Sequence, residues 1–354
     1  MSILSTLFQA GVALKQLGSG TAFRPPEENA ELSDDVRATI DREILPLLEP
    51  LEQFRLEKLA SKTRRKTWFR RLGWLLWLPS LALDLFMLIS GEPTLYTLFV
   101  VGGLGAWILA PELQYTRHYK EKLIPVLLQD FGDYTYEKNG CIDLEAVKSF
   151  SILPKFSSKT SEDYISGDVE GIHFEFCELK LKRRGRKSNK TVHGGGALLI
   201  AMPFQFCGYT VVSADYGKVG NRLTSPLAIS RVALENPEFE DRFEVYGSDQ
   251  QYARYILSPG LMERIIGLDD LFRARAKGAG ITCEFRDNKA LFLLSYYGDL
   301  LDVADIDVSA YDLDKMPLLE QELAMITGII RQLKLDSLAE RNVASNRFER
   351  TMEH

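Results

Sequence analysis

The stretch LGWLLWLPSLALDLFMLISGEPTLYTLFVVGGLGAWILAP, residues 72–111, decides the fold of this chain. It contains two apolar runs of about 18 and 16 residues, close to the shortest length that crosses the hydrocarbon core of a bilayer, and the polar sequence GEPT separates them. Inside lipid each run must be helical, because a helix satisfies its own backbone amides. Gly91 and Pro93 end the first helix. The stretch therefore predicts a two-helix transmembrane hairpin.

Basic residues on both outer flanks of the hairpin predict its orientation. The GEPT connector has no Lys or Arg, whereas the flanks are rich in them, so the positive-inside rule puts the flanks in the cytoplasm and the connector outside. We expect a bacterial inner (cytoplasmic) membrane protein with both termini and the main domain in the cytoplasm. The basic flanks consist of Lys62, Arg64, Arg65, Lys66, Arg70 and Arg71 before the hairpin, and Arg117, Lys120 and Lys122 after it.

The same stretch allows two other readings, and it holds one acid. A buried hairpin in a soluble core and a re-entrant hairpin kinked at Pro79 both remain open, because the runs are short. Asp84 is a candidate intramembrane polar site, although it could also lie at the outer interface or cap a helix contact. The glycines at 102, 103 and 105 would allow close packing in a tight hairpin or an oligomer.

Composition narrows the class of protein. The chain has 354 residues and a net charge of −6, which argues against general nucleic-acid binding. Its four cysteines show no CxxC pair, so we expect reduced, mostly buried thiols and no metal site. No signal peptide is evident, and the hairpin itself would direct insertion. No cofactor is expected. The cysteines are Cys141, Cys177, Cys207 and Cys283.

The segments around the hairpin are predicted to be helical. Residues 1–32 form an N-terminal amphipathic segment and linker, followed by a cytoplasmic helical segment at 33–71 that starts at Ser33 and is kinked or interrupted by Pro46 and Pro50. Residues 112–136 form a stalk helix. Because two helices leaving one side of a hairpin are neighbours, we expect 51–71 to pack on 112–131.

Residues 137–310 are predicted to form a cytoplasmic α+β domain with a mixed, mainly antiparallel sheet. The apolar pattern changes face at Phe176 and Cys177, which indicates a β-bulge there. Residues 182–196 are expected to be a long hairpin tip, and the strand 197–204 to be buried on both faces. A C-terminal helix and mobile tail occupy 311–354.

Local signals give three further predictions in this domain. SDQQ, residues 248–251, is a capping box in which Ser248 would cap a helix. Ser258 and Pro259 would start a second helix. The sequence RDNK would join two strands, 281–285 and 290–296, in a hairpin.

Few residues suggest chemistry. The glycines at 194–196 lack the setting of a phosphate-binding loop and indicate a turn or close backbone approach. Acidic residues cluster at Asp163, Asp168 and Glu170, where turn chemistry is the simpler reading. One basic run is a candidate lipid- or partner-binding site, with a solvated loop as the alternative. It comprises Lys182, Arg183, Arg184, Arg186, Lys187 and Lys190.

Three segments carry a family resemblance. FSSKTSEDYISGDVEGIHFEFCEL (156–179), GALLIAMPF (196–204) and FEDRFEVYGSDQQYARYILSPGLMERI (239–265) resemble the bacterial domain-of-unknown-function family 3137, an uncharacterised family. The resemblance covers most of the region from the stalk to about residue 305. It implies a paired membrane segment ahead of a cytoplasmic domain, and it brings no catalytic residues.

Three functions follow as hypotheses. The leading one is a membrane-anchored binding, scaffold or sensor protein whose partners are the lipid bilayer, anionic lipid, and a protein partner or a second copy of the chain. The second is a membrane-associated enzyme, which requires Asp163 or Glu170 to meet His173 or His193 within hydrogen-bond reach. The third is a transporter or channel subunit that oligomerises around Asp84.

Overall fold

The computed structural model describes residues 45–92, 94–129, 131–185, 188–214, 230–275, 280–296, 304–312 and 321–334, the last without 322 and 325. The chain divides into two compact units. A helical unit comprises Met1–Asp130 and Asp302–Pro317, and a sheet unit comprises Phe131–Leu301 and Leu318–His354. The predicted segment 1–32 and the predicted helix start at Ser33 lie outside the described residues.

Three helices build the helical unit, namely α3 (Leu45–Leu72), α4 (Trp74–Ile89) and α5 (Tyr96–Leu128). The first two are bent by 52° at Gly73, where a Cβ would lie only 2.4 Å from the Phe69 carbonyl oxygen. Pro50 lies inside α3 and does not interrupt it. The second apolar run and the predicted stalk form one continuous helix, which ends at Leu128 rather than at 136.

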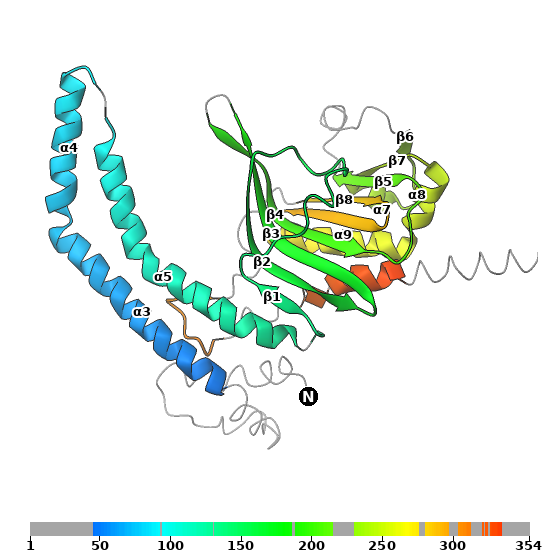
Figure 1. The fold of residues 1–354 in the computed structure, drawn as a ribbon, viewed down its shortest axis with the longest axis horizontal. Helices are drawn as coiled ribbons and strands as arrows, with labels where there is room; N and C mark the ends of the chain where they lie inside the picture. Colours follow the sequence, from blue (N-terminus) through cyan, green and yellow to red (C-terminus); the bar gives the residue numbers. More distant parts are fainter. Residues whose placement is uncertain are drawn as a thin grey trace, which may run out of the picture. The chain divides into compact units, whose positions relative to one another are not determined.

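The lower halves of α3 and α5 pack side by side, as predicted for 51–71 and 112–131 (Figure 1). Phe54 stacks on His118 with 4.5 Å between ring centroids. A return segment, residues 304–312, closes this base. Arg55 Nη1 donates to the Ile306 carbonyl (2.8 Å), and the Glu52 carboxylate accepts from the Ala310 amide (2.7 Å). Residues 302–317 thus group with the helices and not with the domain predicted at 137–310.

The sheet unit contains nine strands within its described residues, in the order β1-β2-β3-β4-β9-β8-β5-β7-β6. Each of the described pairings between neighbouring strands is antiparallel, which confirms the α+β class. The strands are β1 (Thr135–Glu137), β2 (Ser158–Val169), β3 (Ile172–Arg184), β4 (Asn189–Ala201), β5 (Tyr209–Ala214), β6 (Ser230–Val232), β7 (Phe243–Gly247), β8 (Gly280–Arg286) and β9 (Lys289–Ser295).

Both faces of the central sheet are buried, which explains the change of pattern in β3. Phe174 and Phe176 are buried on one face, and Cys177 and Leu179 on the other, so β3 keeps its period of two. The predicted bulge lies instead on the neighbouring strand, where Asp163 and the residue after it face Cys177. The bulge therefore lies opposite the predicted position, but in β2 and not in β3.

A covering segment, residues 141–153, buries the face that carries Cys177 and Leu179. Glu284 projects from β8 on this face and fixes the segment. Its carboxylate is fully buried and accepts hydrogen bonds from the Ser151 amide (2.6 Å), the Ser151 hydroxyl (2.7 Å) and the Ile152 amide (3.1 Å). Arg286 Nε supplies the opposite charge at 2.7 Å, as a buried carboxylate requires.

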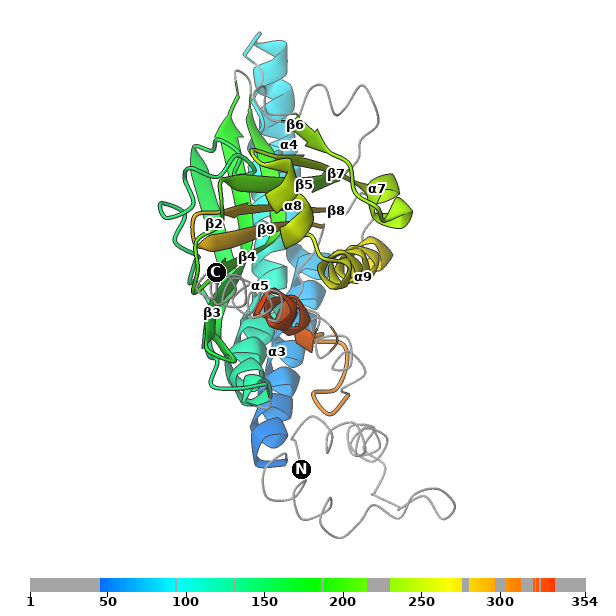
Figure 2. The same cartoon turned by 90° about the vertical axis from the view of Figure 1, so that its right-hand side faces the viewer.

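The sheet unit also contains the helices α7 (Pro237–Arg242), α8 (Gln250–Ile256) and α9 (Pro259–Arg275). The helical residues 326–334 pack against α9, because Gly328 lies beside Arg264 and Gly260 beside Gln332 (Figure 2). This agrees with the predicted C-terminal helix for the described part of 311–354.

The local predictions have mixed outcomes. Asp249 caps α8 by accepting from the amides of residues 251 and 252; the predicted cap at Ser248 is wrong, because its hydroxyl binds the Tyr209 amide of β5 instead (2.9 Å). Ser258 does cap α9, and β8 and β9 do form a hairpin. The tip predicted at 182–196 is shorter, because β3 and β4 stay paired as far as Arg184 and Asn189.

Candidate functional site: the apolar helices and their basic collar

The upper half of the helical unit exposes a large apolar surface. Ile89 at the end of α4 is 79% exposed and Phe99 on α5 is 77% exposed. A soluble fold rarely leaves such side chains in water over a continuous area. The exposed apolar residues of this surface are Leu75, Leu76, Leu78, Leu81, Leu83, Leu85, Phe86, Leu88, Ile89, Leu95, Leu98, Phe99, Val101 and Leu109.

Of the helices described, α5 alone is long and apolar enough to cross a membrane by itself. It has 33 residues, and only 6% of its most apolar window is buried. α4 has 16 residues, which at a rise of 1.5 Å per residue spans about 24 Å, less than a hydrocarbon core of about 30 Å. α4 reaches spanning length only if it counts with α3 as one bent pair. The predicted hairpin thus contains one clear candidate span.

Asp84 on α4 caps the start of α5. Its carboxylate accepts hydrogen bonds from the Thr94 hydroxyl (2.7 Å), the Tyr96 amide (2.9 Å) and the Thr97 amide (2.8 Å). The amides in the first turn of a helix lack partners within that helix, so an acid there satisfies them and complements the helix dipole. The carboxylate thus has a structural use at the closed end of the hairpin. It does not need a transport role to explain it.

We use the term collar for the residues where the apolar surface ends and the basic flank of α3 begins. They are Arg64, Arg65, Lys66, Arg70 and Arg71, with Trp68 and Trp107. Arg65 Nη1 donates to the Trp107 carbonyl (2.6 Å), and its guanidinium lies 5.0 Å from the Trp107 ring. Trp68 meets Trp107 edge to face with 5.6 Å between centroids. Arginine and tryptophan together are typical of the headgroup level of a bilayer. The other collar cations are exposed, namely Arg64, Lys66, Arg70 and Arg71.

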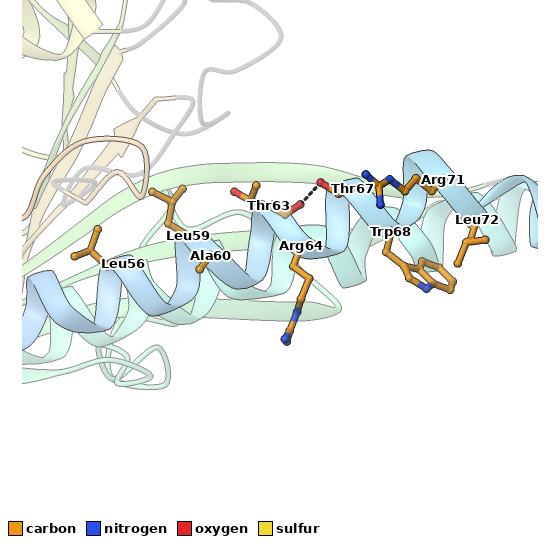
Figure 3. A pocket seen from close by; sticks show the side chains of 9 residues that line it. All are labelled: Leu56, Leu59, Ala60, Thr63, Arg64, Thr67, Trp68, Arg71 and Leu72. Atoms are coloured by element: carbon orange, nitrogen blue, oxygen red, sulfur yellow. Dashed lines mark hydrogen bonds between the residues drawn. The ribbon is translucent and has the colours of Figure 1, made fainter.

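A hollow of about 840 Å³ lies along α3 at the collar. Its described lining residues repeat at three- and four-residue spacing, so they form one helix face. The lining is mostly apolar and also includes two arginines, Arg64 and Arg71 (Figure 3). Such a surface fits a ligand that combines hydrocarbon with negative charge. The lining residues are Leu56, Leu59, Ala60, Thr63, Arg64, Thr67, Trp68, Arg71 and Leu72.

The basic run predicted in the sheet unit lies at the tip of the β3–β4 hairpin. Arg183 stands directly opposite Lys190 in the ladder, and Arg184 follows. Like charges opposite one another repel, so an anion bound at this tip would relieve the strain. Lys182 is half-buried in the same strand. Arg186 and Lys187 lie outside the described residues.

Two residues of the acidic turn, Asp163 and Glu170, have partners that are not histidines. Asp163 accepts from the Tyr136 hydroxyl (2.5 Å), and Glu170 pairs with Lys334 Nζ at 3.1 Å. His193 of β4 faces Leu181 of β3, whereas Asp163 of β2 faces Cys177 of β3. Leu181 and Cys177 are four residues apart, so Asp163 and His193 are separated by roughly 13 Å along the strand direction alone. Burial lowers the pKa of His193 to about 4, so it is neutral at pH 7.

His173 belongs to an exposed pair and not to a cleft. Its Nδ1 lies 3.6 Å from an Asp168 carboxylate oxygen, and both side chains are largely in water. Among the described residues, no group of three or more His, Cys, Asp or Glu side chains is placed to hold a metal ion. The enzyme hypothesis requires Asp163 or Glu170 to meet a histidine; the hydrogen bond and ion pair given above for these two acids are to Tyr136 and Lys334.

Comparison with known proteins gives a family and little more. Residues 191–335 match the family described as "Protein of unknown function (DUF3137)", which confirms the resemblance; the segments 196–204 and 239–265 fall inside the match and 156–179 lies before it. The chain is also similar to the crystal structure of the mycobacterial trehalose monomycolate transport factor A, TtfA, at 10% identity and a TM-score of 0.36, covering 62% of this chain and 93% of that one. No curated protein sequence matches the chain.

Proposed function

We propose that this chain, which belongs to the DUF3137 family over residues 191–335, is a membrane-anchored binding protein. Its helical unit inserts into the bacterial inner membrane, and its sheet unit binds a partner on the cytoplasmic side. The observation that carries the proposal is the exposure of α5, whose most apolar window is only 6% buried. The core helix of a soluble protein would bury most of that window.

The collar supports the orientation. Basic residues gather at the collar, whereas the described part of the connector between α4 and α5 carries Glu92 and no cation. The positive-inside rule favours the collar in the cytoplasm. The sheet unit follows α5 in the sequence and would then stay on the same side.

Cysteine labelling in intact cells tests this topology. We expect a membrane-impermeant maleimide to modify a Glu92→Cys variant without permeabilisation, because Glu92 lies in the outer connector. Native Cys207 is exposed on the sheet unit and serves as the internal control, since it should react only after permeabilisation. Peptide mass spectrometry distinguishes the two sites. Labelling of both sites only after permeabilisation would contradict a crossing hairpin.

We further propose that the collar binds anionic phospholipid. The hollow on α3 offers leucine side chains for acyl chain contact and Arg64 and Arg71 for phosphate. Each cation close to an anionic surface contributes about 1 kcal/mol, so the four exposed collar cations offer a strong preference over neutral lipid. Arg65 is engaged with Trp107 and is kept out of the test.

Tryptophan fluorescence provides the readout for this proposal. All four tryptophans, Trp68, Trp74, Trp77 and Trp107, belong to the helical unit, so quenching by brominated lipid reports on lipid near the collar and helices. In reconstituted vesicles we expect brominated phosphatidylglycerol to quench more strongly than brominated phosphatidylcholine at equal mole fraction. Replacing Arg64, Arg70 and Arg71 by glutamine should remove most of this difference.

A matched control removes three charges elsewhere. Replacing Arg183, Arg184 and Lys190 by glutamine takes the same charge from the β3–β4 tip, in a unit without tryptophan. The lipid preference should survive. If only the tip variant loses the preference, the anionic lipid site lies at the hairpin tip, and the collar proposal is wrong.

A second copy of the chain is the partner that one further observation favours. A Cβ added at Gly102, Gly103 or Gly105 of α5 would meet no atom within 4 Å. Glycines with open space around them let another helix approach closely in lipid. We therefore propose that α5 associates with α5 of a second copy.

A further inference from the structure

Two cysteines that are far apart in the sequence meet in the sheet unit. Cys141 begins the covering segment and packs against the buried cluster that contains Cys177 of β3, and each thiol lies near enough to shift the pKa of the other. The sequence predicted reduced, mostly buried thiols; all four cysteines are free, with Cys177 and Cys283 buried, Cys141 half-buried and Cys207 exposed. No spacing rule could show the contact, because the folding of β2 between them creates it.

The β2 bulge brings the two thiols together. Opposite Cys177, β2 carries its surplus residue, and the chain just before Cys141 runs along this point. The Asp163 amide donates to the Lys138 carbonyl (2.8 Å), and the Ser161 hydroxyl donates to the Gly140 carbonyl (2.7 Å). A Cβ at Gly140 would lie 2.5 Å from Tyr164 Cβ, so only glycine allows this close passage.

Cys141 has the surroundings of a reactive thiol. Lys159 Nζ lies 3.7 Å from its sulfur, and the side chain is half-buried, so small molecules reach it. The neighbouring Cys177 thiol contributes most and, with Lys159, lowers the pKa of Cys141 despite burial. The same contact and its own burial raise the pKa of Cys177. This difference favours the thiolate at Cys141 and the thiol at Cys177, which suits an attacking and a resolving cysteine.

We propose that Cys141 is a peroxide-reactive cysteine that Cys177 resolves, so that the sheet unit carries a reversible disulfide site. The Cys141 thiolate attacks one oxygen of hydrogen peroxide, the O–O bond breaks, and the leaving hydroxide takes a proton to become water. Cys141 is now a sulfenic acid. The Cys177 thiol then displaces its hydroxyl as a second water and forms the S–S bond. Peroxide is reduced by two electrons, and the two thiols are oxidised.

The disulfide would fasten the covering segment to the sheet. Cys141 begins that segment, and Cys177 lies in the cluster that the segment buries. In a reducing cytoplasm such a bond forms transiently and reports oxidation. A dithiol reductant returns both cysteines to thiols.

The first test compares Cys141 with Cys207 in the full-length chain in detergent. Cys207 is the more exposed of the two, so accessibility alone predicts that it reacts first. At pH 6 an unperturbed thiol is only about 0.3% thiolate. The lowered pKa of Cys141 raises its thiolate fraction above this, and its lower nucleophilicity removes part of the gain. We expect Cys141 to be oxidised by hydrogen peroxide about tenfold faster than an unperturbed thiol.

The second test identifies the products by peptide mass spectrometry. We expect wild-type chain to yield a 141–177 disulfide while Cys207 remains a thiol. Cys177→Ser should instead accumulate a sulfenic acid at Cys141, trapped by dimedone. Cys141→Ser, at a half-buried position that tolerates the change, should leave Cys177 unreactive. Lys159→Gln should slow alkylation of Cys141 by iodoacetamide at pH 6 several-fold.

The outcomes that overturn the proposal are specific. Oxidation of Cys207 ahead of Cys141 would show that Cys141 is not activated. Wild-type chain that forms a sulfinic acid at Cys141 with Cys177 still reduced would show that Cys177 does not resolve it. Unchanged kinetics in Cys141→Ser would place the reactive thiol elsewhere.

Discussion

Two arginines in the middle of the apolar run at the start of α5, Val101→Arg and Ala106→Arg together, are expected to remove the chain from the membrane fraction. Both side chains are exposed, so neither change disturbs packing within the helical unit. Each arginine at the centre of a spanning helix costs about 2.5–3.5 kcal/mol, or roughly 5–7 kcal/mol together. Because 1.4 kcal/mol is a factor of ten, insertion falls by a factor on the order of 10⁴ or more. The measurement is the fraction of chain that resists alkaline carbonate extraction.

Leu113→Arg is the matched control. Leu113 lies on the same helix and is 67% exposed, but it follows Pro111 and belongs to the basic flank after the apolar run. An arginine there reaches the headgroups, so membrane recovery should equal that of the wild type. If the double variant also stays in the carbonate-resistant pellet, then α5 does not cross the bilayer and the proposed anchor is wrong.

Gly195→Ala is expected to destabilise the sheet unit. Gly195 lies in β4 with a φ of +138°, and a Cβ there would lie 2.0 Å from the Leu294 carbonyl oxygen and 2.9 Å from the Tyr296 amide nitrogen. Both atoms are backbone, so relief requires β4 and β9 to separate at the middle of the sheet. Backbone strain and lost hydrogen bonds together cost at least about 3 kcal/mol. For a unit of this size the melting temperature should fall by about 10 °C.

Gly194→Ala separates this effect from a general cost of adding a methyl group. Its nearest atom would be Thr191 Cγ2 at 3.8 Å, an ordinary contact. We expect thermal unfolding of the full-length chain, followed by circular dichroism in detergent, to leave Gly194→Ala close to wild type. Equal melting temperatures for the two variants would mean that the close approach of β4 to β9 is not needed for stability.

The sequence predicted the features that depend on local patterns. Length and apolar character located α5, because spanning a bilayer depends on consecutive residues. Apolar runs located β4, β8 and β9, and Ser258 with Pro259 located the start of α9. The glycines at 194–196 were correctly interpreted as a close backbone approach, since Gly195 touches β9.

Features that depend on distant contacts could not be predicted in this way. β3 changes its buried residues from one face to the other because separate segments cover the two faces of the sheet, and the sequence of β3 alone imitates a bulge. Ser248 resembles a helix cap, but the Tyr209 amide already occupies its hydroxyl. The length of α4 was overestimated, because Gly73 belongs to a bend and not to the helix.

In the candidate site, too, local features could be predicted from the sequence and contacts between distant residues could not. The cations of the collar were visible in the sequence as a dense basic flank. The pairing of Arg65 with Trp107 was not, because it joins two helices that the hairpin brings together. Asp84 stood out as an unusual acid, but its partners Thr94, Tyr96 and Thr97 could be assigned only once the turn between the helices was known.

The return segment has a consequence for biosynthesis. Arg55 finds its acceptor on Ile306, 251 residues later in the chain, and a ribosome adding about 5–20 residues per second needs roughly 10–50 s to reach it. During that interval Arg55 and Glu52 can pair with each other, but the Ile306 carbonyl and the Ala310 amide have not yet been synthesised. The contacts of α3 with the return segment therefore form only after the described strands of the sheet have been synthesised.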